Sequence, residues 1–167
     1  FLLRDMEQAV EVIRSALDEG KKITVYGDYD CDGVTATVML HSYLEAMGAE
    51  VDFYIPDRTE GYGMNTDALQ RIIESGTELI ITVDNGISAI EEIEKAKELE
   101  IDVVVTDHHQ AGDVLPDAVA VVDPHRKDCE LDFREWAGVG VAFKLVSAIA
   151  SCDVYDLLEA YGDILAI

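Results

Sequence analysis

The chain has 167 residues, and 12 Lys and Arg against 35 Asp and Glu give a formal net charge of −23 at pH 7. This length suits one domain, and 49% hydrophobic residues can build a core, which excludes disorder driven by charge. A chain this acidic repels nucleic acid and anionic membranes unless cations or a separate basic domain intervene. No apolar stretch approaches the roughly 20 residues of a membrane span, so we expect no membrane contact.

The cysteines and the two chain ends bear on compartment and domain organisation. Cys31, Cys129 and Cys152 have no CxxC spacing, and an odd number cannot pair completely. A reduced intracellular compartment is therefore expected, which indicates the cytoplasm. The chain does not begin with Met and stops in an apolar run, 164–167, that has the pattern of a beginning strand. We expect a piece of a longer protein, with 1–167 forming one C-terminally truncated domain.

Helical and β-type hydrophobic patterns alternate along the chain. Helices are predicted over about 5–19, 34–47, 65–75, 88–99 and 138–149. Strands are predicted at 22–26, 50–55, 79–83, 101–106 and 118–122. The strands are near-continuous apolar runs, which is typical of a sheet covered on both faces. The pattern predicts an α/β fold with a mostly parallel sheet of five or more strands and helices on both faces.

Three helix starts carry residues that can accept hydrogen bonds from exposed backbone N–H groups. Asp5 with Gln8, and Ser88 with Glu91, have the spacing of a capping box. Asn65 is the predicted cap of the helix that follows it.

Acidic and histidine residues directly follow four of the predicted strands. They are Asp28, Asp30 and Asp32 after the first strand, Asp84 after the third, Asp107, His108 and His109 after the fourth, and Asp123 and His125 after the fifth. Because the carboxyl ends of parallel strands share one edge of a sheet, we expect these side chains to converge. Converging carboxylates repel one another unless cations neutralise them, although loop acids can also be merely solvated. A carboxylate and imidazole set without a thiolate cluster favours Mn²⁺ or Mg²⁺ over structural Zn²⁺.

Three other kinds of site share part of this pattern. Residues 28–33 match the start of an EF-hand loop, but its twelfth position is Met39 instead of Glu, and a strand precedes it. Acids after a strand also resemble a phosphatase that forms a phosphoryl-aspartate, which leaves the histidines without a role. The same acids with Asp84 resemble a phosphate-accepting receiver, which needs a Lys where Asp123 stands.

The pair His108-His109 favours a functional interpretation. Isolated loop histidines are usually solvated, but these two follow an Asp at a strand end in a chain with four histidines. One imidazole could bind metal while its neighbour faces the substrate as a proton donor.

Five segments resemble those of a known family. GDYDCDG (27–33), VDNGIS (83–88) and TDHHQ (106–110) are similar to the first three motifs of the DHH phosphoesterases. YIPDRTEGYGMN (54–65) and AGVGVAFKL (137–145) resemble, more narrowly, the bacterial RecJ-type single-stranded-DNA-specific exonucleases. The first motif alone is a weak signal, but five motifs in the same order over essentially the whole chain are a strong one.

The resemblance implies metal-dependent hydrolysis of phosphodiester bonds from the 5′ end of single-stranded DNA, in DNA repair and recombination. It implies two Mn²⁺ or Mg²⁺ ions and, beside the DNA, protein partners from the replication and repair machinery. The implied metal ligands are Asp28, Asp30, Asp32, Asp84 and His108. Asp107 is implied to orient His108, and His109 to contact the scissile phosphate.

Candidate substrate contacts come from two segments. Arg58 is the first choice for a phosphate contact and Lys144 a weaker one, although Arg58 could equally be an ordinary ion-pair partner. Gly138 and Gly140 open a helix whose N–H groups could face a phosphate, or could serve close packing against a strand. Tyr62 could stack on a base, but packing against its own backbone is favoured.

A chain of this charge cannot hold DNA by bulk electrostatics. We therefore expect a local basic patch made by Arg58, Arg126, Lys127, Arg134 and Lys144.

The sequence departs from the family in three respects. A further Asp ligand of the family would come just after Ile167, and the DHH-associated C-terminal domain is absent, so the fragment alone could lack activity. Asp123 stands where Asn before Pro is usual, and it adds negative charge if it points inward.

Two alternative functions stay open. One is a DHH phosphoesterase for short oligonucleotides, cyclic dinucleotides or other small phosphate esters, and the other is a catalytically silent binding module.

Overall fold

The computed structural model describes residues 3–167, which form five strands and six helices. The strands are β1 (Ile23–Tyr26), β2 (Val51–Tyr54), β3 (Leu79–Val83), β4 (Asp102–Thr106) and β5 (Ala120–Val122). The helices are α1 (Met6–Glu19), α2 (Cys31–Ala46), α3 (Thr66–Glu74), α4 (Ile90–Glu98), α5 (Gly138–Ala150) and α6 (Val154–Leu165). The predicted α/β alternation is confirmed.

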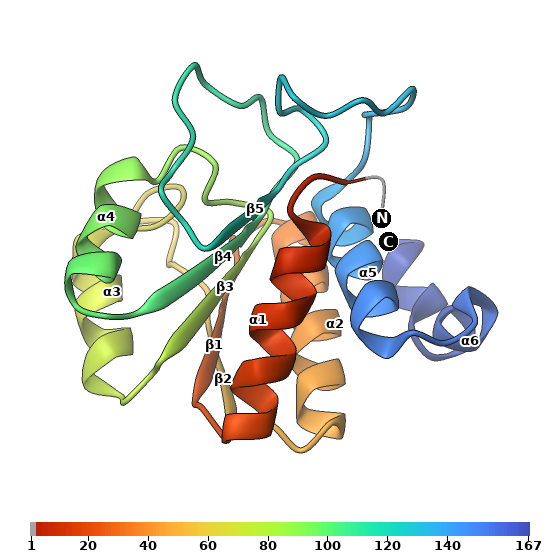
Figure 1. The fold of residues 1–167 in the computed structure, drawn as a ribbon, viewed down its shortest axis with the longest axis horizontal. Coiled ribbons are helices and arrows are strands. Elements are labelled where there is room, and N and C mark those ends of the chain that lie inside the picture. Colours follow the sequence, from red (N-terminus) through yellow and green to blue (C-terminus); the bar gives the residue numbers. More distant parts are fainter. Residues whose placement is uncertain (1–2) are drawn as a thin grey trace.

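All strand pairings are parallel, and the sheet order is β2-β1-β3-β4-β5 (Figure 1). The chain steps outward from β1 to β2 and then crosses back to place β3 on the other side of β1. The strand order therefore reverses between β1 and β3. In open parallel sheets, ligands bind beyond the carboxyl ends of the strands at such a switch point.

Helices cover both faces of the sheet, as predicted. One core joins α1, α2 and α5 to one face, and a second joins α3 and α4 to the other (Figure 1). Alternate residues of β3 divide between them: Ile81 belongs to the first core and Ile80 to the second. Both are fully buried, and each contributes roughly 1.5–3 kcal/mol of hydrophobic free energy. This two-sided burial explains the near-continuous apolar strands.

Two of the three predicted caps are wrong. Asp5 has a left-handed backbone (φ 56°) and gives α1 no side-chain cap, because its carboxylate accepts the backbone N–H of Val121 instead (3.2 Å). Helix α4 begins two residues after Ser88 and has no side-chain cap either. Asn65 does cap α3, accepting the backbone N–H of Ala68 at 2.8 Å.

The predicted strand at 164–167 is wrong, because Ile164 and Leu165 end α6 and Ala166 is its C-cap. Leu157, Tyr161, Ile164 and Leu165 have helical spacing and pack on the core shared by α2 and α5. Asp153 begins the helix by accepting the backbone N–H of Tyr155 at 2.9 Å.

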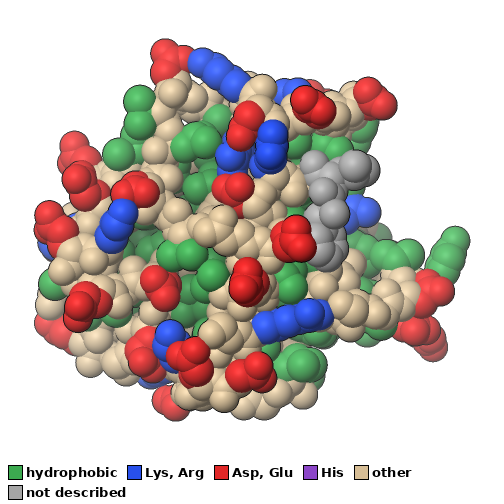
Figure 2. All heavy atoms as spheres, in the orientation of Figure 1, with side chains coloured by type: hydrophobic (Ala, Val, Ile, Leu, Met, Phe, Trp, Pro, Cys, Tyr) green, Lys and Arg blue, Asp and Glu red, His purple; other side chains and the backbone are tan. Residues whose placement is uncertain are grey.

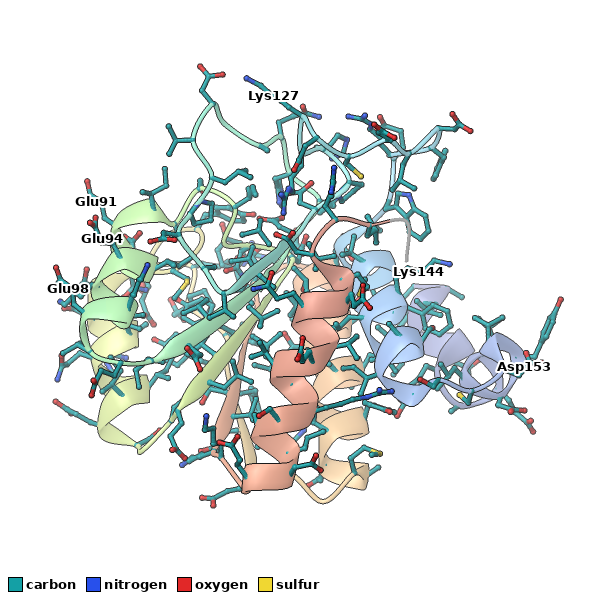
Figure 3. The ribbon with its side chains drawn as sticks, in the orientation of Figure 1. Glu91, Glu94, Glu98, Lys127, Lys144 and Asp153 are labelled. Atoms are coloured by element: carbon teal, nitrogen blue, oxygen red, sulfur yellow. The ribbon has the colours of Figure 1, made fainter. Side chains whose placement is uncertain are left out.

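Acidic side chains are spread over the face seen in Figure 2, with few basic ones among them. On α4, Glu91, Glu94 and Glu98 project from the outer side of the helix (Figure 3). No helix among residues 3–167 has the length and apolar character that crossing a bilayer requires.

Candidate metal centre

Five side chains of types that can bind a metal ion meet at the edge of the sheet where β1, β3 and β4 end. Asp28, Asp30 and Asp84 form one group, and Asp84, His108 and His109 form the other. Within each group, one ligand atom from every residue lies within 4.8 Å of the others. Asp84 belongs to both groups, so the convergence expected from parallel topology is present.

The turn between β1 and α2 places the first two carboxylates. Asp30 caps α2 by accepting the backbone N–H of Gly33 at 2.9 Å. Gly33 lies so close to Asp28 that a Cβ there would be 2.7 Å from the Asp28 backbone, so only glycine fits this turn. Asp28 is 1% exposed, and its Oδ1 has no hydrogen-bond partner within the described chain. Burial, with a smaller contribution from the charge of Asp30, raises the pKa of Asp28.

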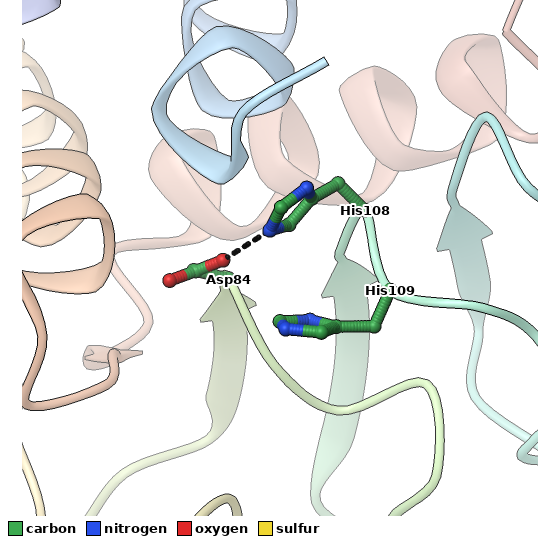
Figure 4. Close-up of side chains that lie close together, drawn as sticks. All are labelled: Asp84, His108 and His109. Atoms are coloured by element: carbon green, nitrogen blue, oxygen red, sulfur yellow. Dashed lines mark ion pairs between the residues drawn. The ribbon is translucent and has the colours of Figure 1, made fainter. Parts of the chain in front are cut away.

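Asp84 lies at the centre of the cluster, directly after β3. Its backbone is left-handed (φ 60°), which stores about 1–3 kcal/mol of strain in a residue other than glycine. Its Oδ1 is 2.9 Å from Nε2 of His108 (Figure 4) but is not aligned with it as a hydrogen bond. Burial raises the pKa of Asp84 to about 6, with the charge of Asp32 adding to the shift and His108 opposing it. The same contact with Asp84 raises the pKa of His108 to about 9.

Asp32 is held by the start of α5. Its carboxylate accepts the backbone N–H groups of Gly138 (2.6 Å) and Val139 (2.7 Å), where the helix dipole favours negative charge. Its Oδ2 lies 3.6 Å from Nε2 of His108, so Asp32 borders the second group. The first N–H groups of α5 therefore face a carboxylate in this structure.

Gly138 also has the close-packing role that the sequence left open. A Cβ at this position would lie 2.4 Å from Oδ1 of Asp84. Gly140 is less restricted, since its Cβ would make an ordinary contact with the Trp136 ring at 3.6 Å. A phosphate contact by Gly138 or Gly140 stays a prediction.

Asp107 orients His109 and not His108, so the partner expected for it is wrong. Its Oδ1 lies 2.7 Å from Nδ1 of His109 and accepts the backbone N–H groups of both histidines. Its Oδ2 accepts the backbone N–H of Ile87 at 2.9 Å. Burial opposes ionisation, but these hydrogen bonds outweigh it and lower the pKa of Asp107. The contact with Asp107 raises the pKa of His109, while the His108 ring is turned toward Asp84 (Figure 4).

Comparison with known proteins agrees with this geometry. Residues 22–167 match the DHH family, N-terminal domain. The chain belongs to the DHH family. It is 53% identical over 151 residues to the single-stranded-DNA-specific exonuclease RecJ of Bacillus subtilis, covering 89% of this chain and 19% of that protein. It is 42% identical to RecJ of Escherichia coli, covering 88% of this chain and 26% of that protein. The DHH domain thus spans about a fifth to a quarter of these relatives.

Two solved structures have the same fold. The crystal structure of exonuclease RecJ bound to manganese matches with a TM-score of 0.82 and 37% identity, over 89% of this chain and 38% of that one. RecJ from Thermus thermophilus in complex with Mn²⁺ matches with a TM-score of 0.73 and 34% identity, over 89% of this chain and 21% of that one. The α/β fold of the DHH domain is therefore confirmed.

The donor set of the DHH domain fits a divalent cation. Oδ1 of Asp28 and Oδ1 of Asp84 are both buried without a hydrogen-bond partner among residues 3–167. Burying a carboxylate oxygen without a hydrogen bond costs free energy of folding unless a positive charge lies next to it. Carboxylate and imidazole ligands suit Mn²⁺, and carboxylates alone suit Mg²⁺.

The two favoured phosphate contacts of the DHH domain each stack on an aromatic ring. The Arg58 guanidinium lies 5.3 Å from the ring centroid of Tyr29, the residue between Asp28 and Asp30 in the sequence. Lys144 lies 5.0 Å from that of Trp136. Within residues 3–167 neither has a carboxylate partner, so the ion-pair alternative for Arg58 is not observed.

The remainder of the predicted basic patch is absent. Arg126 is 7% exposed and pairs with Asp5 and Asp128. Lys127 pairs with Asp113 on a loop (Figure 3). Arg134 donates to backbone carbonyls. These three cationic groups already bind carboxylates or backbone carbonyls, so the predicted basic patch of five residues is wrong.

Two further residues of the DHH domain reach the site. The Tyr62 hydroxyl contacts the backbone carbonyl of Asp84 and the His109 ring, and short-range sequence patterns do not reveal either contact. The glycines on both sides of Tyr62 were the one sequence feature that pointed to this residue. Asp123 is fully buried, its Oδ1 accepts the His125 N–H at 2.6 Å, and its Oδ2 is unpartnered within the described chain. It points inward, as considered above.

Proposed function

We propose that this DHH domain is the catalytic core of a single-stranded-DNA exonuclease that hydrolyses phosphodiester bonds. The carrying observation is that Asp84 belongs to both ligand groups and that Oδ1 of Asp28 and Oδ1 of Asp84 are buried without a hydrogen-bond partner in the described chain. The identity to RecJ exonucleases supports the substrate, since those relatives are named for single-stranded DNA.

Two ions would be held by this chain. Asp28, Asp30 and Asp84 would hold one, and Asp84 with His108 would hold the other, with Asp32 beside it. Divalent ions there would place positive charge against the phosphate and lower the pKa of the attacking water. We propose Mn²⁺ as the preferred metal, supported by the manganese-bound RecJ structures and the imidazole in the set.

His109 is assigned to the phosphate. Its side chain is 45% exposed against 26% for His108, so it is the imidazole that an incoming substrate can reach. Asp107 holds Nδ1 and stabilises the protonated ring, which can then donate to a phosphate oxygen or to the leaving group. Asp107 is accordingly a positioning residue.

Arg58 and Lys144 are assigned to the DNA backbone. Each has a guanidinium or ammonium group without a carboxylate partner in the described part of the chain, unlike Arg126 and Lys127. We further propose 5′ to 3′ polarity, a role in repair and recombination with protein partners, and action in the cytoplasm as one domain of a longer protein. These rest on the resemblance to RecJ.

The test is digestion of single-stranded DNA labelled at its 5′ or 3′ end by the full-length protein, with and without Mn²⁺. Double-stranded DNA and a cyclic dinucleotide serve as competing substrates. We expect metal-dependent release of label from the 5′ end of single strands alone. Asp84→Asn should remove this activity, whereas Asp113→Asn, at a fully surface position, should not. Cleavage of the cyclic dinucleotide alone would support a small phosphate ester as substrate and refute the exonuclease.

A further inference from the structure

Tyr62 lies on a loop that is fixed from both sides. The loop connects β2 to α3, and Tyr26 donates a hydrogen bond from its hydroxyl to the carbonyl of Gly63 at 3.1 Å. At the other side, Tyr54 donates to Glu60 at 2.6 Å. Gly61 and Gly63 have φ of 94° and 81°, a backbone region that side chains rarely adopt. The turn therefore presents Tyr62 to the sheet edge in one defined place.

The Tyr62 hydroxyl reaches the metal centre from this loop. It donates to the backbone carbonyl of Asp84 at 3.1 Å. Asp84 is the residue shared by both ligand groups, and its backbone is left-handed at φ 60°. A strained residue keeps its conformation only when its surroundings hold it, and this hydrogen bond is one of those restraints.

The same oxygen contacts His109. It lies 3.0 Å from Nδ1 and 3.2 Å from Nε2, so it contacts both ring nitrogens. The Tyr62 and His109 rings meet at an interplanar angle of 69° with centroids 5.5 Å apart. Asp107 holds Nδ1 at 2.7 Å, so the imidazole is restrained by a carboxylate at one nitrogen and by the tyrosine hydroxyl beside both.

We propose that Tyr62 is a positioning residue that fixes the His109 imidazole relative to Asp84 through its hydroxyl. The hydroxyl joins the ends of β3 and β4, so the imidazole and the shared carboxylate keep one relative placement. This inference rests on the proposed nuclease function, because the group being positioned is the one assigned to the phosphate.

Base stacking is the competing role for this residue. Tyr62 is 49% exposed, so part of the ring could lie against a base. Stacking needs the ring and not the hydroxyl, whereas positioning needs the hydroxyl. Tyr62→Phe separates the two because it keeps the ring and removes the oxygen.

The activity test compares Tyr62→Phe with Tyr155→Phe in the full-length, Mn²⁺-loaded protein on single-stranded DNA. We expect Tyr62→Phe to lower kcat by about 3- to 10-fold with KM unchanged, as loss of one hydrogen bond predicts. Tyr155→Phe loses the hydroxyl of a 76% exposed ring on α6, outside the loop that carries Tyr62, and should keep kcat. A raised KM with normal kcat in Tyr62→Phe, or equal losses in both variants, would overturn the proposal.

A double-mutant cycle shows whether Tyr62 acts through His109. Tyr62→Phe should have no further effect on kcat in a His109→Ala background, because nothing is left to position. Multiplicative losses would mean that Tyr62 acts independently, and would refute the proposal.

A spectroscopic measurement tests the contact without activity. Tyr62→Phe should shift the ring ¹⁵N and ¹³Cε1 signals of His109 in the metal-free and Mg²⁺-loaded protein, while those of His41 stay in place. Unchanged His109 signals would overturn the proposal. If the wild type does not cut DNA but these signals shift, the nuclease function fails and the positioning contact stands.

Discussion

Replacing Asp123 by Asn should remove a buried charge beside the metal centre. Asp123 is fully buried, and its Oδ2 has no hydrogen-bond partner in the part of the chain that the structure describes. Burial, with a smaller contribution from the charge of Asp107, raises the pKa of Asp123 from 3.8 to about 6. One pKa unit corresponds to about 1.36 kcal/mol, so ionised Asp123 lowers the free energy of unfolding by about 3 kcal/mol at neutral pH.

The raised pKa sets the sign of the pH dependence. Between about pH 4 and pH 6 the folded protein holds a proton on Asp123 that the unfolded chain has released. The contribution of this group to the free energy of unfolding therefore becomes unfavourable as the pH rises through this window. Asn carries no charge and keeps an oxygen to accept the N–H of His125. We expect Asp123→Asn to stabilise by about 2–3 kcal/mol at pH 7.5 but only by about 0.6 kcal/mol at pH 4.

Urea unfolding followed by circular dichroism in EDTA measures both values. Asp113→Asn is the matched control, because the Asp113 side chain is 93% exposed and bonds only to Lys127 among the described residues. Its effect should stay within about 0.5 kcal/mol at either pH. A gain for Asp123→Asn that is the same at pH 4 and pH 7.5, or no gain at pH 7.5, would show that Asp123 is not a buried ionised group.

Four further predictions concern the metal centre. Asp84→Ala should weaken Mn²⁺ binding, measured by calorimetry, by at least about 100-fold. The melting temperature in EDTA should not fall, since Oδ1 of Asp84 receives no hydrogen bond within the described chain. Loss of folding in this variant would assign Asp84 a structural role. His109→Ala should lower kcat far more than Mn²⁺ affinity, and equal losses would make it a ligand. Gly138→Ala should lower the free energy of unfolding by about 1–3 kcal/mol and weaken Mn²⁺ binding, because the added Cβ would overlap Asp84. Gly162→Ala on α6, where the added Cβ meets open space, should change neither quantity. The same result for both variants would contradict this packing. If Arg58 and Lys144 are the two side chains that bind the DNA backbone, the logarithm of single-stranded-DNA affinity should fall with the logarithm of salt concentration with a slope of about −1.4. A slope beyond about −4 would indicate a basic surface elsewhere.

Much of the fold follows from local sequence. Strands β1, β3, β4 and β5 are short, mostly apolar runs, and such a run is buried whichever face of the sheet a residue takes, as Ile80 and Ile81 show. The edge strand β2, with Asp52 and Phe53 exposed, is the exception. Parallel order then brings the carboxyl ends together, so the convergence of Asp28, Asp84 and His108 needs no knowledge of side-chain orientation. These predictions succeed because they depend on strand direction alone.

Other features depend on distant partners that the local pattern does not contain. Asp5 has the spacing of a cap, but its carboxylate binds the buried Arg126 and the backbone N–H of Val121 in β5 instead of the first turn of α1. Asp107 precedes two histidines, and only the ring rotations decide which one it holds. Tyr62 contacts residues 22 and 47 positions away, which no local pattern encodes.

The acidity of this domain and its proposed substrate are compatible once the charges are placed. Exposed acids such as those of α4 lie on an outer helix face, where water and salt screen them beyond about 10 Å. The acids proposed to hold metal lie at the sheet edge, where burial, with a smaller contribution from neighbouring carboxylates, raises the pKa of Asp28 and of Asp84. A bound divalent cation would relieve that repulsion and also face the DNA phosphate. The negative charge that repels DNA in the metal-free domain is therefore the feature that would hold the ions through which DNA binds.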